Sequence, residues 1–355
     1  MEQPKDNRFS VFQTNIIKGF ACLMLIIHHL FFNSPENYDN FTSLIKTSSG
    51  VPLVCVISYI CKICVPMFLL LSGYGINASL NKRIASSTNK KRITVILRSS
   101  AYFLWKLWSG FIFIYILFVP WQPLFGRMPY TNVFDILFDV TGLAYITKTP
   151  MMNNTWWYVG ATLLAYVLTP VIKLFVSRFK MLTLVAVCTM FFFRLYYNAP
   201  LFLLWLGVYI LGMLINETNV ISRLEKAKEL KNIYLITVSL LAVSLCSAYI
   251  FLNYYSALIV GGPVFVSFVF LCVSKIPVLN KFLELVGKHS RNIFLFHTFI
   301  YAYNFSSVVY SLKYPVFIFI GFTAFCVVLS IFIEKLKDLT RFSRLTDFIS
   351  KKISV

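Results

Sequence analysis

Long apolar runs dominate this chain and restrict what it can fold into. A helix that spans a membrane needs roughly 20 mostly apolar residues. Mean hydropathy is +0.75 and only 13% of the residues are charged, which sets the chain apart from soluble domains. We therefore predict an all-α polytopic membrane protein with about ten transmembrane helices. The candidate spans are 11–32, 51–76, 97–119, 155–176, 180–196, 200–216, 232–251, 255–273, 290–311 and 314–335.

Basic residues predict the orientation of these spans. If the N-terminus is inside, 25 of the 33 Lys and Arg residues fall on the cytoplasmic side and five on the outer side. The remaining three, Lys18, Lys62 and Lys106, lie within spans. The positive-inside rule then predicts that both termini are cytoplasmic. It also accounts for the formal charge of +20, so no nucleic-acid partner is expected.

The whole chain is expected to be one integral-membrane domain in the cell membrane. Residues 10–335 would form the bundle and residues 336–355 a basic cytoplasmic tail. No internal repeat and no cleavable signal peptide is evident. The outer loop 120–154 contains "NVFDILFDVTGLAY", whose apolar spacing favours a short interfacial or re-entrant helix. The Cys61/Cys64 pair is typical of an apolar helix face, and neither a metal site nor a disulfide is expected.

Ionisable residues share one face of the first span. Lys18 and His29 are 11 positions apart, which returns to within about 20° of the same face and about 16 Å along the axis. His28 points elsewhere. A charged group at the centre of a spanning helix costs roughly 2.5–3.5 kcal/mol, so such residues usually face a cavity or a partner. The alternative without a functional role is that the ammonium groups of Lys18 and Lys106 extend to the membrane interface and the two histidines lie in the outer headgroup region.

Carboxylates are absent from the middle of the predicted spans, and Glu334 at an inner end is the deepest. The buried cations must then be satisfied by a bound anion, water or backbone carbonyls. An ion-coupled transporter would normally have an intramembrane carboxylate, so the absence of one disfavours that class of protein.

Five segments resemble, in order, the motifs of the acyltransferase-3 family of integral-membrane O-acyltransferases. That family places a basic residue and Gly ahead of a histidine by ten intervening positions, as Lys18-Gly19 and His29 do here. The matching segments are "KGFACLMLIIHH", "VPMFLLLSGYGI", "KKRITVILRSSAYFLW", "WWYVGATLLAYVLTP" and "VGKHSRNIFLFHTFI".

Two positions depart from the family pattern. Lys18 stands where the family often has Arg, and a lysine cannot make a bidentate fork. Thr162 stands where many members have Glu, so no role for that carboxylate carries over. We also expect no fused extracellular hydrolase-like domain.

The resemblance implies an enzyme that moves an acyl group, above all acetyl, from cytoplasmic acyl-CoA to a hydroxyl of a polysaccharide or lipid-linked glycan. His29 would act as general base or form an acyl-histidine, and both remain open. Lys18 would stabilise the thioester oxygen or a CoA phosphate. Four further residues are expected to contact acetyl-CoA or another acyl-CoA, with no metal involved: Arg92, Arg98, His297 and Lys62.

Other roles and other classes remain. Trp156 and Trp157 are expected to anchor their span at the interface. Ser72, Gly73 and Tyr74 are expected to allow a close helix approach. The main alternative is a transporter or flippase for a lipid-linked glycan without catalysis of its own. A glycan polymerase fits less well, because few arginines lie in the predicted outer loops. A membrane sensor fits less well, because it would not explain why Lys18 and His29 share one face of the first span.

Overall fold

The computed structural model describes residues 9–32, 40–87, 91–227, 232–250 and 254–354, without the side chains of 244–250, 254–257 and 354. The described residues form helices joined by short connections, and they contain no strand beyond an isolated bridge between Lys46 and Pro52. The predicted all-α class is confirmed.

The chain packs into two compact units, each assembled from three separate segments. The first unit contains Met1–Ala21, Ile63–Ser100 and Leu168–Lys288. The second unit contains Cys22–Lys62, Ala101–Val167 and His289–Val355. Because the segments alternate along the chain, this division does not separate consecutive domains. The prediction of one domain over 1–355 stays a prediction.

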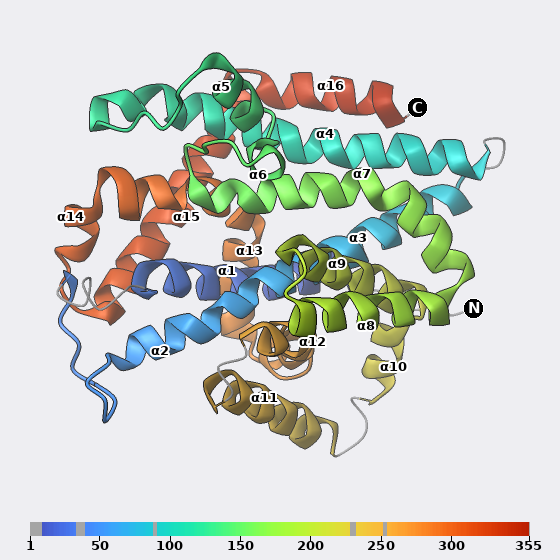
Figure 1. The fold of residues 1–355 in the computed structure, drawn as a ribbon, viewed down its shortest axis with the longest axis horizontal. Helices are drawn as coiled ribbons and strands as arrows, with labels where there is room; N and C mark the ends of the chain where they lie inside the picture. The colour runs from blue at the N-terminus through green and yellow to red at the C-terminus, as the bar shows by residue number, and fades with distance from the viewer. Residues whose placement is uncertain (1–8, 33–39, 88–90, 228–231, 251–253, 355) are drawn as a thin grey trace. The chain divides into compact units, whose positions relative to one another are not determined.

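The helices that begin in the first unit are α1 (Val11–Phe31), α3 (Cys64–Ala85), α4 (Arg92–Phe118), α8 (Lys180–Tyr197), α9 (Leu201–Glu217), α10 (Val220–Ala227), α11 (Ile233–Ile250), α12 (Tyr254–Leu271), η5 (Val273–Lys275) and α13 (Pro277–Thr298). Those that begin in the second unit are α2 (Leu53–Ile60), η2 (Cys61–Ile63), η3 (Val119–Phe125), α5 (Val133–Val140), α6 (Ala144–Thr147), η4 (Asn154–Trp156), α7 (Trp157–Arg178), η6 (Phe299–Asn304), α14 (Ser306–Tyr310), α15 (Pro315–Leu339) and α16 (Phe342–Ser354). Five of them, α1, η2, α4, α7 and α13, continue from one unit into the other. Figure 1 labels these elements along the chain.

Seven helical segments of the described chain are long and apolar enough to cross a membrane. An eighth is gained if α9 and α10, which meet at a bend of 67°, form one span. The polytopic membrane class is therefore confirmed. The count of ten spans and the cytoplasmic location of the termini stay predictions. In α11 the described apolar segment covers only Ile233–Val243, which is shorter than a membrane span.

The helix expected over residues 290–311 has different limits. α13 already begins at Pro277, a residue favoured at the first helical position. Its buried Leu283 and Val286 face the interior while Lys281 and Lys288 stay exposed, so hydropathy alone places its start too late. After Thr298 the chain makes the π-helical segment η6 and then the short α14.

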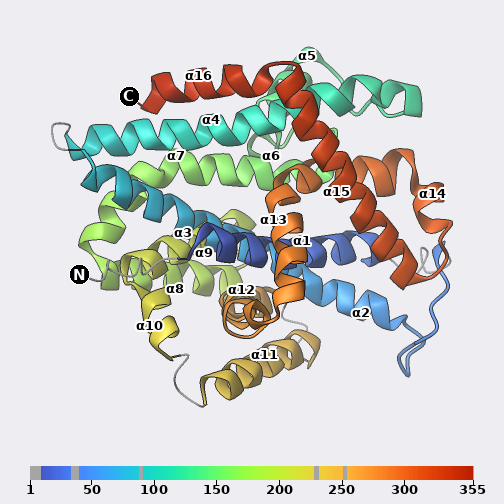
Figure 2. The same ribbon diagram turned by 180° about the vertical axis from the view of Figure 1, so that it is seen from behind.

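Residues 336–355, expected as a cytoplasmic tail, are largely helical. α15 continues to Leu339, and α16 then runs beside α4 in both views, along the part of α4 that contains Trp105 and Phe113 (Figure 1, Figure 2). The Trp105 indole N–H donates to the Thr346 carbonyl at 3.1 Å. Lys106, predicted to lack an ion-pair partner, has its Nζ 3.5 Å from Asp347. That prediction is wrong for Lys106, because no local pattern indicates that α16 lies along α4.

A close crossing joins α3 and α9 in the first unit. A Cβ added to Gly73 would overlap the carbonyl oxygen of Tyr209, and one added to Gly212 would overlap that of Leu70. The two glycines therefore let the two backbones meet. The close helix approach predicted at Gly73 is confirmed.

We expect Gly73→Ala to lower the free energy of unfolding of the purified protein by about 1–3 kcal/mol, because a backbone carbonyl must move to admit the new methyl group. Gly75→Ala on the same helix is the matched control, since its Cβ would meet nothing within 4 Å. Thermal unfolding in detergent compares the two. A Gly73→Ala variant as stable as Gly75→Ala would contradict the close crossing.

Candidate functional site

Three histidines meet in the second unit. His28 and His29 lie in the last turns of α1, and His297 lies at the end of α13. The ring centroids of His29 and His297 are 4.8 Å apart, and those of His28 and His29 are 4.9 Å apart. Tyr301 completes the group: its ring stacks on His297 at 5.8 Å and lies 6.2 Å from His29.

Hydrogen bonds distinguish the three rings. Nδ1 of His28 donates to the Ser58 carbonyl at 2.8 Å. Nδ1 of His297 donates to the Phe294 carbonyl at 2.9 Å, and the Ile293 carbonyl lies at 3.1 Å. A carbonyl only accepts, so in its neutral form His297 keeps its lone pair on Nε2. Neither ring nitrogen of His29 has a hydrogen bond to any residue that the structure describes.

Exposure adds to this contrast. His297 is fully buried and His28 is 7% exposed, whereas His29 keeps accessible surface. His29 thus keeps some accessible surface and has no hydrogen bond to its ring among the described residues, and its neighbours hold their rings in fixed orientations. The separation of His29 from His28, predicted from helical spacing, agrees with this difference in bonding.

A line of hydroxyl and amide groups runs from His297 to the start of α7. The Thr298 Oγ1 lies 3.5 Å from Nε2 of His297 and 3.3 Å from the Thr155 Oγ1. The Thr155 hydroxyl donates in turn to Asn153 Oδ1 at 2.8 Å. The Trp156 indole N–H donates to the Leu295 carbonyl at 2.9 Å. With 2% exposure, Trp156 is a packing residue of this site, so the prediction that it anchors the interface is wrong.

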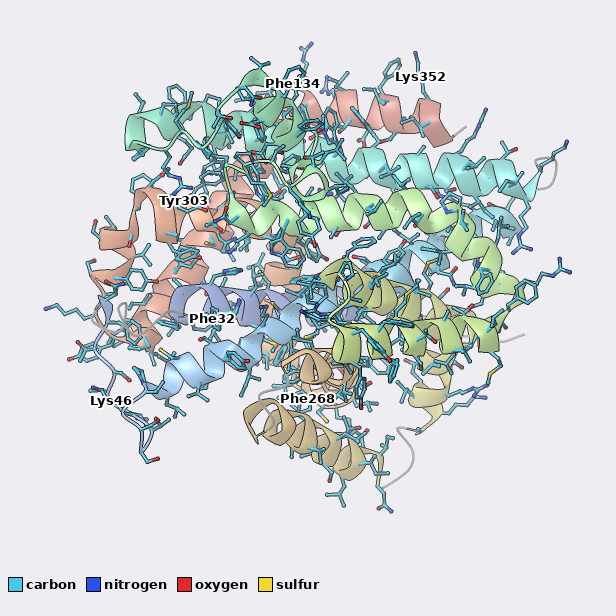
Figure 3. The ribbon with its side chains drawn as sticks, in the orientation of Figure 1. Phe32, Lys46, Phe134, Phe268, Tyr303 and Lys352 are labelled. Carbon is cyan, nitrogen blue, oxygen red and sulfur yellow. The ribbon has the colours of Figure 1, made fainter. Side chains whose placement is uncertain are left out.

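The loop 120–154 supplies a further cluster next to η6. The guanidinium of Arg127 lies 3.4 Å over the ring of Tyr303, a residue labelled in Figure 3. Arg127 also donates to the Met152 carbonyl at 3.3 Å, and the Met152 N–H donates to Asp139 at 2.9 Å. Burial raises the pKa of the Asp139 carboxyl, while hydrogen bonds from Tyr130 and Met152 oppose that rise.

Asp139 lies on α5, which begins with a capping box formed by Asn132 and Asp135. A short helix was predicted in this part of the loop, and it is present.

The other predicted site residues are divided between the units. Lys62 lies in η2 of the second unit, half-buried and close enough to His28 and His29 to act on both electrostatically. Lys18 is half-buried on the part of α1 in the first unit. Arg92 and Arg98 are exposed on the part of α4 in that same unit. The second unit thus brings together His29, His297 and Lys62.

Several residues of the site escaped the sequence analysis. Tyr301 follows His297 by four positions, the spacing of helical neighbours, and this signal was available. Thr155, Asn153 and Thr298 carried no recognisable pattern. The π-helical η6 that carries Tyr301 and Tyr303 has no sequence signature, although such segments often mark functional sites.

The family profile described as an acyltransferase domain matches residues 13–335, nearly the whole chain. The chain belongs to the acyltransferase-3 family. No curated protein and no solved structure shows a significant match. The protein is thus a multi-pass membrane acyltransferase.

Two motif glycines of this acyltransferase have a clear packing role in the first unit. A Cβ on Gly19 would overlap the carbonyl oxygen of Leu283, and one on Gly287 would overlap that of Asn15. Both positions therefore require glycine where α1 and α13 cross. In the second unit the same two helices bring His29 against His297.

Thr162, at the position where many family members have Glu, is buried and donates its hydroxyl to the Tyr158 carbonyl at 2.7 Å. Its side chain is committed to its own helix and offers no substitute for a carboxylate.

Proposed function

We propose that this acyltransferase moves an acyl group, above all acetyl, from cytoplasmic acyl-CoA to a hydroxyl of a cell-surface or exported polysaccharide. The proposed location is the cell membrane. One observation supports the chemistry most strongly: His29 is reachable, has no hydrogen bond among the described residues, and lies against a second imidazole. Such a pair can receive and pass a proton during acyl transfer.

The reaction needs a base because a free hydroxyl is a poor nucleophile, and imidazole accepts protons near neutral pH. In the direct route, His29 takes the proton of the acceptor hydroxyl while the hydroxyl oxygen bonds to the acyl carbon of the thioester. The carbon–sulfur bond breaks, and the proton passes to the CoA thiolate. In the covalent route, a neutral ring nitrogen of His29 bonds to the thioester carbon, and the carbon–sulfur bond breaks to release CoA thiolate. The acceptor oxygen then bonds to the acyl carbon, the carbon–nitrogen bond to His29 breaks, and a base takes the hydroxyl proton, which the CoA thiolate finally receives. Both routes remain open.

His297 is proposed to work with His29 in either route. His297, expected to contact CoA, has its ring directly against His29. Its Nδ1–H is committed to main-chain carbonyls, so Nε2 is the nitrogen that can accept a proton. In the covalent route this nitrogen would serve as the base for the acceptor hydroxyl.

We expect His297→Gln to lower kcat by about 10- to 100-fold with a smaller effect on the KM for the donor, since proton transfer by a placed base contributes on this scale. His289→Gln is the control on the same helix, because its hydrogen bond to Ser330 lies away from the histidine cluster. Steady-state kinetics on both variants checks the prediction. A His297→Gln variant that changes only the donor KM would restore the original assignment to CoA.

The cations are proposed to serve the donor. Arg92 and Arg98 would bind CoA phosphates at the cytoplasmic mouth. Lys18 would stabilise the thioester oxygen or a phosphate. Lys62, beside the histidines, would attract the negative charge that develops on the acyl oxygen.

The alternative is a transporter or flippase for a lipid-linked glycan. One observation in the first unit favours it. Lys173 in α7 is fully buried and pairs with Glu217 at 2.8 Å. Buried charge pairs are common in transporters. The pair therefore weakens the argument against a transporter that rests on the absence of carboxylates from the middle of the spans.

Reconstitution in liposomes separates the two functions. The purified protein receives acetyl-CoA and polysaccharide from the host surface, and a thiol-reactive dye follows CoA release. We expect one thiol for each acetyl ester formed on the polysaccharide. A transporter without catalysis would release no thiol and form no ester, and that result would overturn the proposal.

A further inference from the structure

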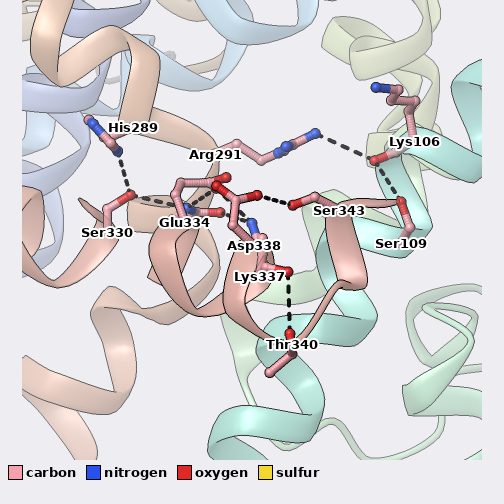
Figure 4. A network of polar contacts seen from close by, with 11 residues as sticks. Lys106, Ser109, His289, Arg291, Ser330, Glu334, Lys337, Asp338, Thr340 and Ser343 are labelled. Carbon is pink, nitrogen blue, oxygen red and sulfur yellow. Dashed lines mark hydrogen bonds and ion pairs between the residues drawn. The ribbon is translucent and has the colours of Figure 1, made fainter. Parts of the chain in front are cut away.

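A polar pocket of about 200 Å³ lies in the second unit, apart from the histidine cluster. Residues of α4, α13, α15 and α16 line it, and five of its side chains are charged: Lys106, Arg291, Lys337, Glu334 and Asp347. Figure 4 shows the first four of these in their polar network. Three cations face two carboxylates, which leaves a surplus of one positive charge. Nothing in the proposed function uses this pocket.

Two of the cations have carboxylate partners. Lys337 is buried, and its ammonium donates to Glu334 at 2.7 Å and to Asn292 Oδ1 at 3.0 Å. The Lys337 ammonium is thus already bonded within the wall of the pocket. Lys106 lies 3.5 Å from Asp347, with side chains 43% and 63% exposed. An ion pair this long and exposed contributes little and yields readily to a stronger anion.

Arg291 carries the surplus charge. Its guanidinium makes one hydrogen bond, from Nη1 to the Lys106 carbonyl at 3.4 Å, and no described carboxylate lies within ion-pair distance of it. Glu334 acts on it only from a distance. An arginine presents five donors in a planar fork that matches a phosphate. Four of those donors remain for a ligand that enters the pocket.

The wall formed by α16 is held in place by apolar and polar contacts. The ring of Phe342 lies 4.8 Å from that of Phe113, and Trp105 bonds to Thr346 as described above. On its other side α16 leaves Leu345 and Phe348 exposed, at 53% and 56%. α16 thus lines the pocket with one face and presents an apolar surface on the opposite face.

We propose that this pocket binds a phosphate group between Arg291 and Lys106. Arg291 would donate two parallel hydrogen bonds, and the ammonium of Lys106 would exchange Asp347 for the phosphate. Two sources offer this chemistry: the phosphates of the CoA donor and the head group of an anionic phospholipid. The CoA source rests on the proposed function, whereas the lipid source does not.

The test measures binding rather than turnover. The full-length protein is placed in nanodiscs of phosphatidylcholine, and equilibrium binding of radiolabelled CoA is measured. In a second arm, native mass spectrometry follows phosphatidylglycerol retained by the protein. Both arms compare Arg291→Gln and Lys106→Gln with Lys335→Gln, which removes an equal charge from an exposed position on α15 outside the pocket.

We expect Arg291→Gln to weaken one of the two ligands about tenfold or more, because a charge-assisted contact is lost. Lys335→Gln should leave both unchanged. Asp347→Asn should tighten the same ligand about two- to fivefold, since a competing carboxylate is gone. Loss of CoA binding identifies the donor, and loss of phosphatidylglycerol alone identifies the lipid.

The proposal is overturned if Arg291→Gln and Lys106→Gln leave both ligands bound as in the wild type, or if the wild type binds neither. Failure of CoA binding in the wild type with retained, Arg291-dependent lipid would contradict the proposed donor while supporting the pocket. Turnover measured on the same samples reports the proposed function separately.

Discussion

Replacing His29 with alanine is expected to lower acetyl transfer by about 100-fold or more, the scale on which a placed general base or nucleophile contributes. The expectation follows from the ring's bonding and position. His29 has accessible surface, no hydrogen bond among the described residues, and the fixed ring of His297 at 4.8 Å. Removal of the imidazole takes away the reacting group without breaking a hydrogen bond that supports the fold. Transfer from acetyl-CoA in liposomes measures the loss.

The neighbouring residue provides the control. His28→Asn keeps an N–H donor for the Ser58 carbonyl, the one hydrogen bond of that ring. We expect a much smaller loss of transfer than for His29→Ala. Size-exclusion profiles and thermal midpoints establish that both variants fold. Equal losses in the two variants would mean that His29 has no special role.

The second large effect is expected in the first unit, where Lys173→Met should destabilise the protein by about 3–5 kcal/mol. The Lys173 ammonium is fully buried and donates to Asn81 Oδ1 at 2.6 Å and to Glu217 at 2.8 Å. Its removal leaves the Glu217 carboxylate with only the amide of Asn77 at 2.9 Å and that of Asn81 at 3.2 Å. The lost partner is the one that balanced the charge.

Two further variants sharpen this prediction. Lys180→Met removes an exposed lysine and should change the free energy of unfolding by less than about 0.5 kcal/mol. The double variant Lys173→Met/Glu217→Leu should recover part of the loss, because it removes the uncompensated carboxylate as well. Thermal unfolding of the purified proteins provides the readout. A Lys173→Met protein as stable as the Lys180→Met protein would show that the pair does not support the first unit.

The expected helix over the first span is present as α1, and helical spacing supplied the prediction for its ionisable residues. Because side chains repeat every 3.6 residues, Lys18 and His29 could be placed on one face and His28 apart from them. The bonding of His28 to the Ser58 carbonyl agrees with that separation. Apolar runs of about 20 residues likewise located most spans, since length and hydropathy are local properties.

Contacts between distant segments could not be predicted in this way. His297 meets His29, and Asp347 meets Lys106, because of how helices pack and not because of any local pattern. The same holds for Lys173, which lies near the inner end of the predicted span 155–176 and is buried in α7 beside Glu217. Burial of a charge depends on its partner, and one sequence does not reveal that partner.

The central claim is that the protein esterifies a surface polysaccharide through His29. Its most direct test is the amount of ester-linked acetate on the polysaccharide of cells that carry the wild type, His29→Ala or an empty vector. We predict acetate with the wild type, and with His29→Ala only the level of the empty vector, at equal amounts of membrane protein. Wild-type acetate levels in the His29→Ala cells, or no acetate in the wild-type cells, would contradict the account.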